Sequence, residues 1–118
     1  MLQRRSEERF MCADLVKIQV GRGRKRTHET VANLEDISPS GACLQLETAV
    51  QEGADVQILC ARCKLRGKIK YCRLIESGYC VGVEFNKPKS WTLRRFKPRH
   101  FLDIALLGIS ITGQGKQA

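Results

Sequence analysis

The sequence predicts a mainly β fold, either a closed barrel or a sandwich of short strands. Two features support this fold class. Apolar residues recur at every second position in several short segments, which is the period of a strand with one buried face. Turn-forming residues separate these segments at short intervals, as in all-β domains and unlike parallel α/β sheets. With 118 residues, the chain is long enough for one compact domain with a modest hydrophobic core.

The first four predicted strands follow one another with clear breaks. The first begins near Leu15 and carries alternating apolar residues. The glycines and basic residues of 21–28 then predict an exposed hairpin loop, followed by a second strand around 29–35. A turn over 36–41 leads directly into the third strand. The alternating apolar residues that define strands one, three and four are Val16, Ile18 and Val20, then Ala42, Leu44 and Leu46, then Val56, Ile58 and Cys60.

The fifth predicted strand, from Arg62 to Tyr71, has the clearest alternation. Its two faces are basic residues at Arg62, Lys64, Arg66, Lys68 and Lys70, and apolar or small residues at Cys63, Leu65, Gly67, Ile69 and Tyr71. The basic face is interpreted as a solvated outer surface whose lysines discourage edge-to-edge pairing, with direct ligand contact as the alternative. A turn at Glu76–Gly78 then precedes the last strand, Tyr79–Phe85.

The C-terminal segment has a different character. Asn86-Lys87-Pro88 ends the last strand, and Ser90 is a suitable N-cap for a helical segment over 90–109, interrupted at Pro98. Its apolar face is expected to cap the domain's own core, with a partner protein as the alternative. The Gly- and Gln-rich tail, 113–118, is expected to be disordered.

Charge and composition restrict the class of partner. There are 21 Lys and Arg against 12 Asp and Glu, a formal net charge of +9, which favours phosphate-bearing partners. The first ten residues contain no apolar run, so we expect no signal peptide, and the six cysteines are then expected to be free thiols in the cytoplasm. The apolar stretch Phe101–Ile111 is interrupted by Asp103 and is shorter than the roughly 20 residues of a membrane span.

The first candidate site is the segment Arg4–Arg9, where Arg5 and Arg9 are four residues apart just before the first strand. Planar guanidinium groups on a flexible arm can bind phosphate oxygens bidentately and can stack on a base or donate to guanine acceptors. The simpler alternative is an exposed segment in which these arginines pair with Glu7 and Glu8.

The second candidate site is Asp36-Ile37-Ser38-Pro39-Ser40-Gly41, between two predicted strands. Asp36 and Ser38 are two residues apart in extended chain, so both side chains point to one face of the sheet. A carboxylate and a hydroxyl together match the donors on the edge of guanine. Pro39 suits the turn, and Gly41 permits close approach of a ligand to the backbone. The alternative is a turn in which Asp36 and Ser38 bond only to the local backbone.

In this order, the two motifs resemble the PilZ domain family, bacterial receptors for the second messenger cyclic di-GMP. The family pattern is R-x-x-x-R in an N-terminal loop, a strand hairpin, and then [D/N]-x-S-x-x-G. Both elements are intact here, as 5–9 and 36–41. The resemblance extends to 79–85, which is similar to the family's closing G-V-E-F strand, and covers roughly Arg4 to Phe85. The paired motifs are specific where either one alone would be weak.

The resemblance implies a six-stranded antiparallel barrel with a C-terminal helix, in a single domain over 1–112. Residues 1–11 would be a flexible ligand-binding arm, and 12–86 the barrel. The implied ligand, cyclic di-GMP, would lie on the outer barrel wall beneath the folded-over arm. The ligand-binding residues carried over in this way are Arg4, Arg5 and Arg9 for the phosphates and guanine faces, and Asp36, Ser38 and Gly41 for a guanine edge.

The resemblance also implies a mechanism and a stoichiometry. The arginines of the arm repel one another until a ligand with two phosphate charges orders them. The ordered arm would then change a surface that an unidentified downstream protein binds. Arg4 occupies a position that favours two intercalated ligand molecules. No cofactor other than this ligand is implied, and no catalytic role is expected, since His28 and His100 have no evident nucleophile or metal as partner.

Three other functions are considered. Cys60 and Cys63 have a zinc-like spacing, but Cys72 and Cys80 are eight apart, so free cysteines are the preferred interpretation. A nucleic-acid-binding barrel would fit the charge, yet the 6% aromatic content leaves few stacking platforms, and Trp91 lies outside the strands. A ligand-independent protein adaptor of the same family is the third alternative, against which the intact motifs argue.

Overall fold

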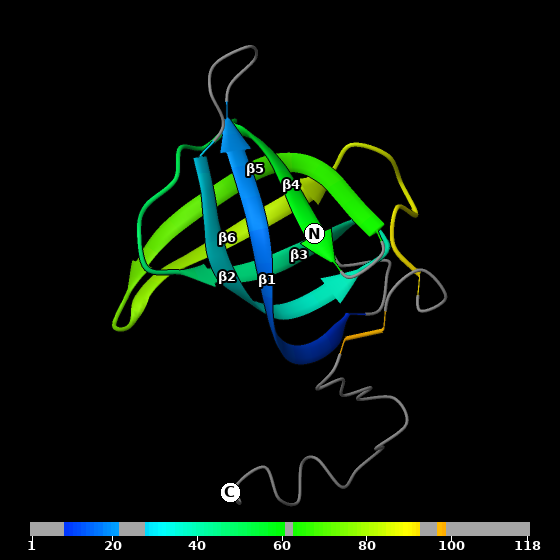
Figure 1. The fold of residues 1–118 in the computed structure, drawn as a ribbon, viewed down its shortest axis with the longest axis horizontal. Coiled ribbons are helices and arrows are strands. Elements are labelled where there is room, and N and C mark those ends of the chain that lie inside the picture. Colours follow the sequence, from blue (N-terminus) through cyan, green and yellow to red (C-terminus); the bar gives the residue numbers. More distant parts are fainter. Residues whose placement is uncertain (1–8, 22–27, 61–62, 93–96, 99–118) are drawn as a thin grey trace, which may run out of the picture.

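A computed structural model describes residues 9–21, 28–60, 63–92, 97 and 98. Within them, six antiparallel strands close into a barrel with the order β1-β2-β3-β6-β5-β4 (Figure 1). The strands are β1 (Phe10–Gly21), β2 (His28–Ser38), β3 (Gly41–Leu46), β4 (Asp55–Cys60), β5 (Cys63–Ile75) and β6 (Gly78–Phe85). The mainly β prediction is therefore confirmed, and of its two alternatives the chain adopts the barrel.

The barrel interior is filled by the alternating apolar residues of all six strands. Because successive side chains of a strand point to opposite faces, each strand supplies every second residue to the core. Ile18, Leu34, Leu44, Ile58, Ile69 and Val81 are among the buried residues that form this core. The predicted core positions of the first, third and fourth strands are all buried.

The first two strands are longer than predicted. β1 begins at Phe10 rather than near Leu15, and β2 continues through Asp36 to Ser38. The early part of β1 has the polar residue Asp14 at a position where the alternation requires an apolar one, and the pairing with β2 shifts register between Met11 and Asp14. In β2, the predicted turn residues Asp36 and Ile37 pair with β1 and β3, and Ser38 pairs with β3.

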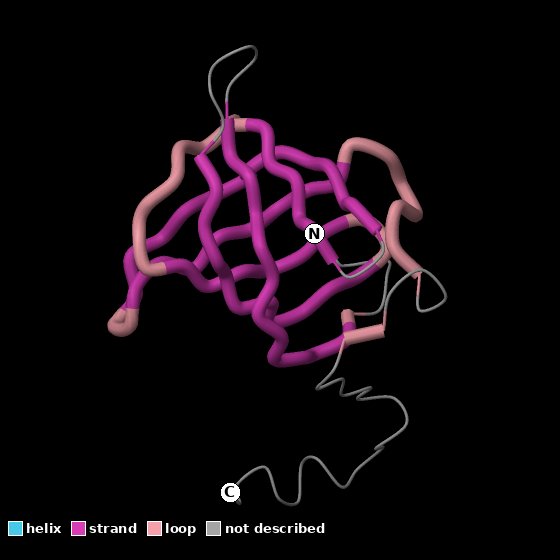
Figure 2. Tube along the Cα trace, viewed as in Figure 1, coloured by secondary structure: helices cyan, strands magenta, loops and turns pink. Residues whose placement is uncertain are grey.

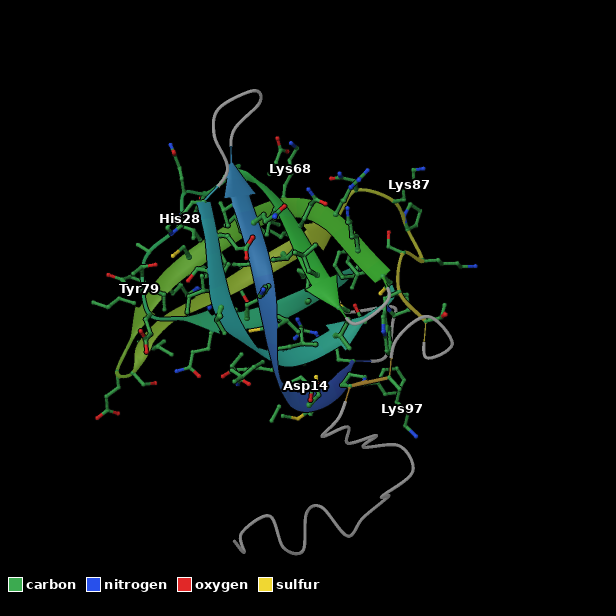
Figure 3. All side chains as sticks on the ribbon, viewed as in Figure 1. Asp14, His28, Lys68, Tyr79, Lys87 and Lys97 are labelled. Carbon is green, nitrogen blue, oxygen red and sulfur yellow. The ribbon has the colours of Figure 1, made fainter. Side chains whose placement is uncertain are left out.

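The outer face of β5 carries the basic residues, as predicted. Lys64, Arg66, Lys68 and Lys70 are exposed, and Lys68 forms an ion pair with Asp55 of β4 at 2.6 Å between Nζ and Oδ1. Figure 3 shows Lys68 at the end of the barrel opposite to Asp14. The interpretation of these lysines as a solvated face agrees with their exposure, while Arg62 lies outside the described residues.

The prediction for Tyr71 was wrong. Alternation from Cys63 placed Tyr71 on the inner face, but the register shifts between Ile69 and Tyr71, where Ile69 pairs with Val83 and Tyr71 with Gly82. The extra residue is a β-bulge, and one inserted residue moves every following side chain to the opposite face. Tyr71 therefore lies on the outer wall, and Cys72 packs against the core instead.

The segment after β6 packs across the end of the barrel. Trp91 is buried in the core cluster, and its ring lies 5.6 Å from that of Phe10, between ring centroids. The described part of 90–109, which is Ser90–Thr92, Lys97 and Pro98, has no regular secondary structure, and Figure 2 draws it as loop. The rest of the predicted helical segment and the tail 113–118 lie outside the described residues. Among those that are described, no helix has the length and apolar composition needed to cross a membrane.

Candidate functional site

The hairpin of β1 and β2 brings the two sequence motifs together. In an antiparallel pair, the start of the first strand meets the end of the second, and here Phe10 pairs with Ile37 and Met11 with Asp36. Arg9 directly precedes β1, and its Nε lies 3.6 Å from Oδ1 of Asp36. The Arg9 side chain is 39% exposed and that of Asp36 is 18% exposed. Arg4 and Arg5 lie outside the described residues.

A β-bulge in β2 presents two consecutive carboxylates on the outer wall. Leu34 pairs with Leu44 and Asp36 with Cys43, so Glu35 and Asp36 together oppose Cys43. Leu34 and Ile37 both remain in the core, which leaves the two acidic residues between them on the outside. Leu34 and Ile37 are three residues apart, whereas buried residues of a regular strand are two apart. This spacing is the sequence signal for the bulge.

The turn of the second motif is held by the protein's own backbone. Ser38 pairs with Gly41, and its hydroxyl donates a 3.4 Å hydrogen bond to the Gly41 carbonyl oxygen. The Phe85 amide donates to the Ser40 carbonyl at 2.8 Å, and the Trp91 amide donates to the Pro39 carbonyl at 3.4 Å. Ser38 is buried. Its hydroxyl bonds to the local backbone, which is the alternative interpretation of this motif.

Gly41 has a packing role that the sequence did not indicate. A Cβ atom at this position would lie 2.5 Å from the carbonyl oxygen of Val83 on the neighbouring strand β6. Contacts this short do not occur with real side chains. Glycine is therefore required for the close approach of β3 to β6, in addition to any approach of a ligand.

Replacing Gly41 by alanine is expected to lower the free energy of unfolding by about 2 kcal/mol, because backbone must move to admit the new methyl group. Urea denaturation followed by circular dichroism measures the change. The matched control is Gly82→Ala, whose new Cβ would overlap only the ring of Tyr71, a side chain that can swing outward. A smaller loss is expected for the control, and a larger loss for it than for Gly41→Ala would contradict the packing role.

Tyr71 extends the site across β6 to β5. Its ring packs over Gly82, which has no side chain to displace it, and the Arg73 guanidinium carbon lies 4.3 Å from the ring centroid. Burial raises the pKa of Tyr71, the nearby thiols of Cys43 and Cys80 raise it further, and the positive charges of Arg73 and Arg9 lower it. Arg9 is thus close enough to act electrostatically on Tyr71 as well as on Asp36.

Two thiols occupy the wall between the acidic bulge and Tyr71. The sulfurs of Cys43 and Cys80 are 3.5 Å apart, and the Cys43 thiol donates to Oε1 of Glu35 at 3.9 Å. Burial and the Cys80 thiol, followed by the charge of Asp36, raise the pKa of Cys43 to about 12. Burial, followed by the charges of Asp14 and Asp36, raises the pKa of Cys12 to about 12 as well.

The remaining motif residues are dispersed. Cys60 and Cys63 face each other as partners in the β4–β5 pairing. Cys72 and Cys80 lie on β5 and β6. In the described parts of the chain, no three His, Cys, Asp or Glu side chains gather as a metal site. His28 is exposed at the start of β2, and His100 lies outside the described residues.

The chain is thus a small closed β-barrel domain, in which Arg9 is ion-paired with Asp36 of the second motif on the outer wall. The PilZ domain model matches residues 3–97, and the chain belongs to the PilZ domain family. No curated protein matches the chain.

Similar solved structures come from several bacteria. The Bacillus subtilis inhibitor of motility, MotI/DgrA, has a TM-score of 0.50 and 14% identity, covering 74% of this chain and 44% of its own. The K. pneumonia MrkH–c-di-GMP complex has a TM-score of 0.54 and 19% identity, covering 99% and 57% respectively. The PilZ domain of Escherichia coli YcgR with c-di-GMP has a TM-score of 0.49 and 18% identity, covering 72% and 79%. This chain therefore spans about half the length of the first and second of these proteins.

Proposed function

We propose that this chain is a receptor that binds cyclic di-GMP on the outer wall of the barrel. The observation that carries the proposal is the 3.6 Å ion pair between Arg9 and Asp36, which unites the two motifs of the PilZ family at one place. Family membership supports the same ligand, and so do the complexes of MrkH and of the YcgR domain with c-di-GMP. No catalytic step belongs to this proposal.

The ligand would exchange partners with the Arg9–Asp36 pair. In the free protein each charge neutralises the other, at partly exposed positions where such a pair contributes little to stability. Cyclic di-GMP offers phosphate oxygens to the Arg9 guanidinium and the ring N–H and amino group of guanine to the Asp36 carboxylate. Both charged groups therefore keep a partner when the ligand binds, and their contacts with the ligand offset the cost of separating them.

Other members of the site would surround this pair. We propose that Arg4 and Arg5 add phosphate and base contacts from the arm. Ser38 and Gly41, in the turn motif, would contact the guanine edge. The Arg73 guanidinium, stacked on Tyr71, offers an exposed plane on which a base can lie. Tyr71 and Arg73 were not recognised as site residues from the sequence, because the bulge in β5 reverses their orientation.

Signal transmission would follow from ordering of the arm. Binding adds two negative charges among Arg4, Arg5 and Arg9, which offsets the mutual repulsion of these side chains. The ordered arm would then present a different surface from the free one, and an unidentified downstream protein would bind that surface.

The proposal is tested by calorimetric titration of the wild-type chain with cyclic di-GMP, cyclic di-AMP and GTP. We expect cyclic di-AMP to bind at least about a hundredfold more weakly, since adenine lacks the donors for Asp36 and each hydrogen bond to a charged group contributes about 1.5–3 kcal/mol. Equal affinity for both dinucleotides would contradict the role of Asp36. Failure to bind any of the three would leave the adaptor function as the better account.

A further inference from the structure

Cys43 and Cys80 form a close thiol pair that the binding site does not use. They lie on the adjacent strands β3 and β6, where Cys43 pairs with Gly82 and Cys80 with Gln45, so the two cysteines are diagonal neighbours on one face. Their sulfurs are 3.5 Å apart, a hydrogen-bond contact between two free thiols in which either thiol can donate. We infer that Cys43 and Cys80 are a thiol–disulfide exchange site, which a low-molecular-weight disulfide such as oxidised glutathione converts to a reversible intramolecular disulfide.

The geometry requires only a small movement. A disulfide has an S–S length of about 2.05 Å, so the two sulfurs, now 3.5 Å apart, must approach each other by roughly 1.5 Å. Both cysteines are anchored in paired strands of the same sheet, which keeps their backbones at a fixed separation. The pair is therefore preorganised for bond formation with each other rather than with thiols elsewhere in the chain.

The environment of the two thiols assigns them different roles in the exchange. Cys80 is the more exposed of the two, whereas only 8% of Cys43 is exposed. Burial, the Cys80 thiol and the nearby Asp36 charge raise the pKa of Cys43 to about 12, so Cys43 stays protonated and is a poor first nucleophile. Exchange with an external disulfide therefore starts at Cys80.

The proposed exchange is balanced in two steps. The Cys80 thiolate attacks one sulfur of oxidised glutathione, forming a mixed disulfide and releasing one glutathione thiolate. Cys43 then loses its proton to the glutathione thiolate released in the first step and attacks the Cys80 sulfur. The S–S bond to glutathione breaks, and the second glutathione thiolate leaves. In total, two protein thiols are oxidised and one glutathione disulfide is reduced to two thiols.

The position of the pair connects this chemistry to the ligand site. Cys43 lies directly opposite Asp36 in the β2–β3 pairing, and both thiols are close enough to Tyr71 to raise its pKa. If the proposed function is correct, bound cyclic di-GMP covers this part of the wall and hinders access of glutathione to Cys80. This protection rests on the proposed function, whereas the disulfide itself does not.

The test incubates the full chain, without nucleotide, in buffers of defined ratio of oxidised to reduced glutathione, followed by alkylation and peptide mapping. The expected product is one linkage between the Cys43 and Cys80 peptides, with loss of the two thiol hydrogens, reversed by excess reduced glutathione. Cys63→Ser is the matched control, because it removes the other facing pair, Cys60 and Cys63, and leaves the proposed site intact. The same linkage is expected in this variant.

Two outcomes would overturn the inference. One is that Cys43 and Cys80 both remain alkylatable while a disulfide forms elsewhere in the wild type. The other is that Cys80→Ser, shown to be folded by circular dichroism, still consumes oxidised glutathione and protects Cys43 from alkylation as the wild type does. Both measurements are made without ligand, so their failure is distinguishable from failure of the chain to bind cyclic di-GMP.

Protection by the ligand is measured separately. At cyclic di-GMP concentrations of about one hundred times Kd, roughly one per cent of the protein is free, so the rate of disulfide formation is expected to fall at least tenfold. If the chain binds the ligand and the rate is unchanged, the thiol pair lies outside the ligand's footprint and the proposed connection is refuted.

Discussion

Replacing Arg9 by alanine is expected to weaken binding of cyclic di-GMP about a hundredfold or more. Arg9 is the residue that joins the arm to the acidic motif, with its Nε 3.6 Å from Asp36. Loss of the guanidinium removes charge-assisted hydrogen bonds to phosphate, each of which contributes about 1.5–3 kcal/mol, and two such bonds correspond to roughly this factor. Calorimetric titration of the variant beside the wild type measures the change.

Two further variants separate the guanidinium from simple charge. Lys17→Ala removes one positive charge from β1, the strand that Arg9 precedes, at an exposed residue whose Nζ lies 3.8 Å from Glu29, and is expected to leave affinity almost unchanged. Arg9→Lys keeps the charge without the planar fork and is expected to have an intermediate affinity. An Arg9→Ala variant that binds within about threefold of the wild type, a difference below 1 kcal/mol, would refute the proposed site.

Replacing Trp91 by alanine is expected to lower the free energy of unfolding by about 3–5 kcal/mol, the usual cost of removing a large buried aromatic side chain. Only 1% of Trp91 is exposed. Its ring packs on Phe10, the residue after Arg9, and its amide donates to the Pro39 carbonyl. Trp91 thus fastens the start of β1 to the turn of the second motif, and its loss is expected to weaken ligand binding as well.

Urea denaturation followed by circular dichroism tests this expectation, since Trp91 is the single tryptophan and its fluorescence disappears with the substitution. Leu15→Ala is the control, because Leu15 is a large apolar residue with 77% of its surface exposed, and its change is expected to stay within about 0.5 kcal/mol. A loss below about 1 kcal/mol for Trp91→Ala would mean that the segment after β6 does not anchor the barrel end.

The alternation of apolar residues predicted most of the barrel but not its irregularities. Ile18, Leu44 and Ile58 are buried as their spacing predicts, because a strand with one buried face has apolar residues at every second position. Tyr71 was assigned to the wrong face, since a strict alternation contains no place for the extra residue of a bulge. The start of β1 at Phe10 was missed because the polar Asp14 interrupts the apolar alternation before Val16.

The motif residues could be named from the sequence, and part of their convergence follows from local topology. Arg9 comes just before β1, and Asp36 falls near the end of β2. A hairpin places these two chain positions side by side, so their meeting requires no long-range information. The role of Gly41 against the Val83 carbonyl could not be inferred in this way, because it depends on contact with a strand about forty residues later in the chain.

By itself, the sequence determined the strand pattern, the family and the five motif residues, since each of these depends on residue type and spacing within a short segment. Only the tertiary structure decided what lies beside them on the neighbouring strands: the Arg73–Tyr71 stack and the thiol pair of Cys43 and Cys80. The physical reason is that β3 is paired with β6, and β6 with β5. Such pairings join distant segments in a register that no local period specifies.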